Sequence, residues 1–289
     1  MHQLTTIARP IDPMYQTNRA IIIMTLLVST GAAVSSLYLG ETLFSAIFQG
    51  FVACLAIFFA WAISRELDPD SEYAAFLPAL ICIPLLLIAP EPGLLTSLFM
   101  TSLFMLLLLR IVNRTTGQPA GVLDSAALLL LAGWLVSGGF WLAGPAAVAA
   151  FILDGHLNDP NPRQLRFAAL LIIGVVAYIA IFGVIFSPLP LPASSWLLIW
   201  MLAAPLFFSS VLFRKSPILS VGDRTKEPLD RGRVQAARLL GLSVVLVAIA
   251  TGGVGAFVLL LPLWASLVGL GVYGCIMWVV RGSRSRMYI

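Results

Sequence analysis

Long apolar runs alternate with short polar segments along the chain, and this pattern predicts membrane-spanning helices. A helix needs about 20 apolar residues to cross a hydrocarbon core roughly 30 Å thick. The sequence therefore predicts an all-α, polytopic integral membrane bundle of about ten transmembrane helices, forming a single domain over residues 1–289. The expected spans are 20–38, 43–63, 74–89, 94–112, 122–137, 139–153, 167–187, 193–213, 237–257 and 259–280.

Composition excludes a water-soluble domain. Of the 289 residues, 60% are hydrophobic and 10% are charged, and the mean hydropathy is +0.99. Soluble chains are nearer 45–50% apolar and about 25% charged. The three cysteines, Cys54, Cys82 and Cys275, are widely spaced in apolar runs, which suggests neither a disulfide framework nor a cysteine metal site.

The distribution of charge predicts the orientation of the bundle. All 17 Lys and Arg residues fall in segments on one predicted side, whereas the turns on the other side carry only Glu41 and Glu91. Because cationic loops stay in the cytoplasm, we expect both termini to be cytoplasmic in a bacterial-type inner membrane. The cytoplasmic segments are then an N-terminal tail (1–19), a basic loop (214–236, with Arg238 just beyond it) and a C-terminal tail (281–289).

The stretch 122–153 permits more than one arrangement. A glycine-rich turn near Gly138 and Gly144 favours either two short spans or a re-entrant hairpin that buries its backbone against other helices. One long tilted helix would move the basic loop to the outer side, which the charge distribution disfavours.

Polar chemistry collects in the predicted cytoplasmic segments. Carboxylate oxygens are the ligands that Mg²⁺ prefers, and arginines bind phosphate oxygens. The sequence therefore suggests a Mg²⁺ site beside a phosphate site. The alternative is that these residues form ordinary turns and solvated helix ends, with Asp124 capping a helix and His156 on a loop. The metal candidates are Glu66, Asp68, Asp70, Asp154 and Asp159, the phosphate candidates are Arg65, Arg114 and Arg163, and the catalytic residues are unknown.

In one respect the layout resembles the UbiA-type intramembrane prenyltransferases. That family carries acidic motifs in cytoplasmic loops after its second and sixth helices, where Glu66, Asp68 and Asp70, and then Asp154 and Asp159, lie here. The resemblance implies a Mg²⁺-dependent site for a lipid-linked or isoprenyl diphosphate-type substrate. The family's first motif, Asn-Asp-x-x-Asp-x-x-x-Asp, is not present in this sequence.

Two other functions fit the same pattern. A small-solute transporter is one, although the absence of mid-membrane charge disfavours an ion-coupled mechanism. A non-catalytic membrane subunit or assembly factor is the other, with the basic segment 214–238 docking a cytoplasmic or membrane protein partner or contacting anionic lipid headgroups. Nucleic acid is not an expected partner, because the net charge is only +4 and the basic segment lacks interleaved aromatic residues.

Overall fold

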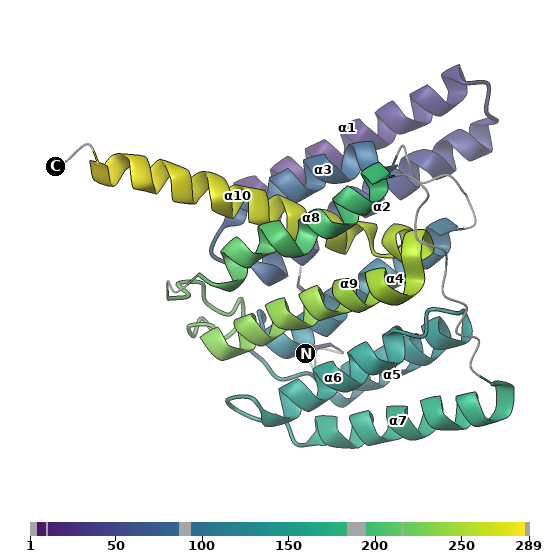
Figure 1. Cartoon of the computed structure of the whole chain (residues 1–289), viewed down its shortest axis with the longest axis vertical. Coiled ribbons are helices and arrows are strands. Elements are labelled where there is room, and N and C mark those ends of the chain that lie inside the picture. Colours follow the sequence, from purple (N-terminus) through teal and green to yellow (C-terminus); the bar gives the residue numbers. More distant parts are fainter. Residues whose placement is uncertain (1–4, 10, 87–93, 184–194, 215–216, 287–289) are drawn as a thin grey trace.

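The computed structural model describes residues 5–9, 11–86, 94–183, 195–214 and 217–286, and these residues form a bundle of α-helices (Figure 1). The predicted all-α class is therefore confirmed. Within the described ranges the helices are α1 (Gln16–Tyr38), α2 (Leu43–Leu67), the short 3-10 helix η1 (Glu72–Ala75), α3 (Phe76–Leu86), α4 (Leu94–Asn113), α5 (Val122–Ser137), α6 (Ala143–His156), α7 (Arg163–Phe182), α8 (Ser195–Leu212), α9 (Arg231–Leu259) and α10 (Leu261–Arg286).

Five of the described helices are long and apolar enough to cross a membrane: α1, α2, α7, and the parts of α9 and α10 over Arg231–Thr251 and Leu261–Val280. They support a membrane protein. Shorter apolar helices fill much of the remaining chain, among them α5. The stretch 122–153 is not one long helix, because a turn at 138–142 separates α5 from α6.

The helices are arranged in three groups (Figure 1). On one side α10 packs against α8, α3 and α2, and α1 lies against α2. On the other side α6 packs against α5 and α7. Helices α4 and α9 pack together between these groups, and α4 also contacts α2 and α6. The central pair therefore joins two sets of helices that are far apart in the sequence.

Small residues allow α10 to approach its neighbours closely. A methyl group at Gly269 would overlap Pro78 of α3, and one at Gly271 would overlap the backbone of Phe207 in α8. Without a hydrophobic effect to drive helices together in lipid, such backbone approach is a main source of packing energy. A side chain at either glycine would push α10 away from its neighbours.

The outermost helices expose most of their apolar surface. Only 17% of the most apolar window of α1 and 11% of that of α7 is buried, against 56% in α10. Ile173 and Ile181 of α7 are exposed, as are Leu26 and Leu27 of α1. In a membrane these faces contact lipid, and α2, α4, α9 and α10 form the interior.

The structure corrects the boundary of the predicted basic loop. Helix α9 begins at Arg231, so the last eight residues of the segment 214–238 are helical. The side chain of Asp230 accepts a hydrogen bond from the Arg233 N–H at 2.8 Å and caps this helix. Arg233 and Arg238 then lie within the first turns of α9, where carboxylates from other helices balance their charge.

Candidate functional site

Most of the predicted polar residues meet at one end of the bundle, on the left in Figure 1, which we call the polar end. There α2, α4 and α6 end and α9 begins. Three carboxylates of this end are buried: Glu66 and Asp154 are fully inaccessible, and Asp68 is 1% exposed. A buried carboxylate is costly unless it is paired, and each of these three lies between two arginines.

Glu66 lies in the last turn of α2 and joins four chain segments. Its Oε1 is 2.9 Å from the Arg110 Nε of α4 and 3.2 Å from the Arg9 Nη1 of the N-terminal segment. Its Oε2 accepts hydrogen bonds from the Asn113 amide, at 3.1 Å, and from the Thr115 hydroxyl. With four donors on its two oxygens, the carboxylate has no vacant position that faces solvent.

Asp68 follows α2 directly and is held in the same manner. Its Oδ1 is 3.1 Å from the Arg238 Nη2 of α9, and its Oδ2 is 3.1 Å from the Arg214 Nη1. The Arg238 Nε also donates to the Leu67 carbonyl at 2.7 Å. This Asp68 cluster ties the end of α2 to the beginning of α9 and to the residue that precedes the basic loop.

Asp154 lies near the end of α6 and balances two buried arginines. Its Oδ1 accepts hydrogen bonds from the Arg114 Nε at 2.9 Å and from the Arg233 Nη1 at 2.7 Å. The Arg114 Nη1 reaches on to the exposed Asp159 at 2.6 Å. Both Arg114 and Asp159 adopt positive φ values, 52° and 54°, which strains a non-glycine backbone. Their ion pair helps to hold this conformation.

The N-terminal segment 5–9 crosses the polar end and is fixed along its length. The Thr5 and Thr6 hydroxyls donate to Asp124, and Ile7 is 4% exposed. Arg9 forms ion pairs with Glu66 and Asp223. Burial alone would lower the pKa of Arg9, but these two carboxylates outweigh it and raise the pKa. Arg9 therefore stays charged as a clamp on the segment.

The basic loop forms a short hairpin, residues 217–229, that is anchored on the polar end. Val221 and Pro228 pair as an antiparallel bridge. The Asp70 carboxylate accepts hydrogen bonds from the backbone N–H groups of Leu219 and Ser220, at 3.0 and 2.8 Å. Asp70 therefore positions the hairpin. Its oxygens are engaged by backbone donors rather than directed towards Glu66 or Asp68.

The other candidate residues occupy separate positions. Asp124 accepts a hydrogen bond from the Gly121 N–H at 3.1 Å and so caps α5, as its place in the sequence suggested. His156 is exposed, and its ring contacts only the Ile152 carbonyl among the interactions of the described residues. Arg65 pairs with Glu72 at 3.3 Å. Arg163 is exposed and has no polar partner in the described ranges.

The five predicted metal ligands are therefore divided among different partners. In the described part of the chain, no group of three or more His, Cys, Asp or Glu residues is placed to hold a metal ion. What this arrangement can do chemically is fix segments and balance buried arginines. Comparisons of the chain with protein-family models, with curated proteins and with solved structures found no match.

Sequence reasoning missed several residues of the polar end. Arg9, Arg110 and Asn113 bind Glu66, yet they lie 57, 44 and 47 positions from it in the sequence. A local motif cannot reveal such pairs. The available signal was that arginines and carboxylates both occur at the predicted cytoplasmic ends of apolar helices, where burial would require them to pair.

Proposed function

We propose that the protein is a non-catalytic multi-pass subunit of a bacterial-type inner membrane, with both termini cytoplasmic, that docks a partner protein through the hairpin 217–229. Ten helix crossings with the polar end in the cytoplasm agree with the position of all 17 cations. The pairing of Glu66, Asp68 and Asp154 with arginines supports a structural role for these carboxylates rather than metal chemistry.

The observation that carries this proposal is an apolar face on a firmly anchored polar loop. Pro217, Leu219 and Val221 alternate along the first strand of the hairpin and are all exposed. The Leu219 side chain is 79% exposed and that of Val221 is 45% exposed. Exposed apolar residues grouped together outside a membrane span are typical of an interaction site. Their rigid support lowers the entropic cost of binding.

Charge around this face defines the partner. Lys226 and Arg231 are exposed and have no polar partner in the described ranges, and Lys226 is held at a positive φ of 58°. An apolar centre with a basic rim fits a cytoplasmic protein that presents an apolar pocket with acidic residues around it. Charge complementarity at the rim would speed association, and the apolar side chains would supply the affinity.

In-cell cross-linking tests this proposal directly. A photoreactive amino acid at position 219 should yield one stoichiometric protein adduct, whereas the same probe at position 173, on the exposed face of α7, should yield lipid adducts. Replacing both Leu219 and Val221 by Asp should abolish the protein adduct without unfolding the protein, because both side chains are exposed. Only lipid adducts from position 219, or an undiminished protein adduct in the double variant, would contradict docking.

The magnesium hypothesis stays a prediction with its own test. Binding of Mg²⁺ and an isoprenyl diphosphate by Glu66, Asp68 or Asp154 would require these carboxylates to leave their arginines. Native mass spectrometry of the purified protein with both compounds added should therefore show no metal-dependent adduct. An adduct that is lost in Asp68→Asn would instead favour the enzyme hypothesis.

A further inference from the structure

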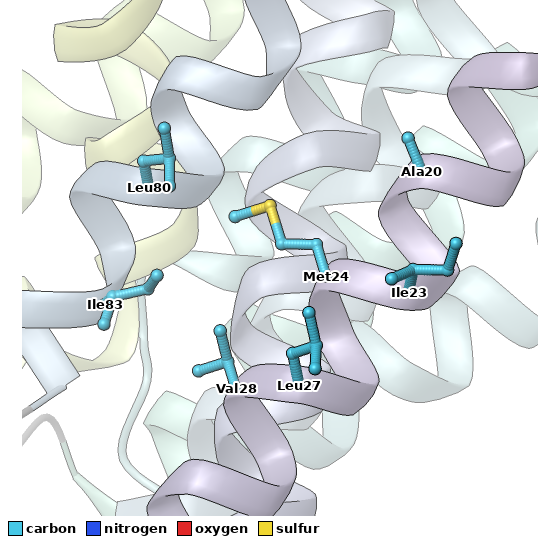
Figure 2. Close-up of a pocket in the computed structure, with 7 residues that line it drawn as sticks. All are labelled: Ala20, Ile23, Met24, Leu27, Val28, Leu80 and Ile83. Carbon is cyan, nitrogen blue, oxygen red and sulfur yellow. The ribbon is translucent and has the colours of Figure 1, made fainter.

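A second feature lies away from the polar end, where α1 and α3 form an apolar groove (Figure 2). The groove has a volume of about 380 Å³. Met24 and Val28 extend from α1 towards α3, and Leu80 and Ile83 line the opposite side. The complete lining is apolar: Ala20, Ile23, Met24, Leu27, Val28, Leu80 and Ile83.

The groove opens to the surroundings of the bundle rather than into its interior. The Leu27 and Ile23 side chains at its wall are 69% and 52% exposed, and Leu80 is 53% exposed. Helix α1 is one of the five helices able to cross a membrane. The groove therefore faces the hydrocarbon of the bilayer, where its occupant is either a lipid chain or a helix of another protein.

Size distinguishes these two occupants. Ala20 and Val28 are eight residues apart, so the groove follows α1 for about 12 Å. A helix of that length, about 10–12 Å across with its side chains, would occupy roughly 1,000 Å³ or more. The groove offers about 380 Å³. It accepts a single flexible chain but not a helix.

A cation marks the end of the groove at which a headgroup would lie. Arg19 immediately precedes Ala20, is exposed, and has no ion pair or side-chain hydrogen bond within the described residues. At the same end of the bundle Arg65 closes α2, the antiparallel neighbour of α1, and its Nη1 is buried without a hydrogen-bond partner. Cations at the headgroup level attract anionic lipids.

We propose that the groove between α1 and α3 binds one acyl chain of an anionic glycerophospholipid, whose phosphate lies at Arg19. The apolar lining determines the chain site, and the cation determines the preference for an anionic headgroup. This site is separate from the hairpin 217–229, and its existence does not depend on the docking of a partner protein there.

Photolabelling of the purified full-length protein in liposomes tests the proposal. The liposomes contain equal parts of phosphatidylglycerol and phosphatidylcholine, with a diazirine on the acyl chain of one lipid at a time. We expect label on residues 20–28 and 80–83, about fivefold more from phosphatidylglycerol than from phosphatidylcholine, as about 1 kcal/mol per cation implies. Label spread evenly over all exposed helices, including α7, would overturn the site.

Variants separate the groove from general lipid contact. Met24→Trp fills the groove and should reduce labelling of residues 80–83 severalfold, whereas Leu26→Trp, an equally large change at a 60% exposed position outside the lining, should leave it unchanged. Arg19→Gln should retain the label but lose the preference for phosphatidylglycerol. Equal labelling in both Trp variants would overturn the groove as the binding site. If Met24→Trp does not fold, the map from the wild-type protein decides alone.

Discussion

The arginines of the polar end differ sharply from those at the outer helices, although both groups follow the same positive-inside pattern. Arg114, Arg233 and Arg238 are no more than 6% exposed, and each binds a buried carboxylate. Arg163 and Arg166, at the beginning of α7, are exposed and lack polar partners in the described ranges. Cations with the same topological signal therefore have two roles. One group joins helices, and the other faces the lipid headgroups and water.

The comparison predicts the largest effect at Asp154. Asp154→Asn leaves Arg114 and Arg233 buried with a weaker partner, and we expect a loss of about 3–5 kcal/mol in the free energy of unfolding. Asp159→Asn is the matched control, because it removes the other carboxylate on Arg114 but one that is 85% exposed. We expect that change to cost no more than about 1 kcal/mol. Denaturant unfolding in micelles measures both, and equal losses would contradict the distinction.

A smaller effect is expected at Arg238. Arg238→Met removes the donors to Asp68 and to the Leu67 carbonyl, while Arg214 still balances the carboxylate. Loss of these charge-assisted hydrogen bonds should cost about 1.5–3 kcal/mol. Arg231→Met lies in the same helix at an exposed position and should change stability by less than about 0.5 kcal/mol. The same denaturation series compares them, and the comparison fails if Arg231→Met is the more harmful.

The N-terminal segment should respond to loss of its clamp. Arg9→Ala removes the ion pairs to Glu66 and Asp223, and because Arg9 is 20% exposed we expect a cost of about 1–2 kcal/mol. Residues 5–9 should then be cleaved faster by protease than in the wild-type protein, and Arg19→Ala provides the control. Unchanged cleavage in Arg9→Ala would show that Thr5 and Thr6 hold the segment without Arg9.

The smallest effect concerns the cap of α9. Burial alone would raise the pKa of Asp230, but hydrogen bonds from the Asn158 amide and the Arg233 N–H outweigh it and lower the pKa. A carboxylate with a lowered pKa stabilises the fold above its unfolded pKa of about 3.9, and this contribution is lost as the pH falls through the folded pKa. Asp230→Ala should therefore cost about 1 kcal/mol at neutral pH. The difference in thermal midpoint from the wild type should shrink below about pH 4, and a constant difference would exclude an ionised cap.

Much of the fold could be predicted from the sequence, because helices in lipid must bury their own backbone groups in apolar runs of defined length. The predicted span 43–63 lies within α2, and the predicted span 122–137 coincides with α5. The beginning of α9 was placed too late, at 237 instead of Arg231. Arg231, Arg233 and Arg238 resemble loop residues when their counter-ions on distant segments are unknown.

The candidate site was less accessible to sequence reasoning. Carboxylates after α2 and near the end of α6 were correctly identified as unusual, but spacing in the sequence does not reveal which charges face them. Glu66 binds Arg9 and Arg110 across separations of 57 and 44 residues. Only the packing of α2 against α4 brings these groups together. The acidic pattern that suggests a metal site is equally the pattern of counter-ions for buried arginines.

The most direct test of this account is a double-mutant cycle between Asp154 and Arg233. Unfolding free energies of Asp154→Ala, Arg233→Ala and the double variant, measured in the same micelles, give the interaction between the two side chains. A structural ion pair predicts that the double variant loses less than the sum of the single losses, by about 2–3 kcal/mol. Additive losses, within about 0.5 kcal/mol, would contradict the role of Asp154 as a structural counter-ion.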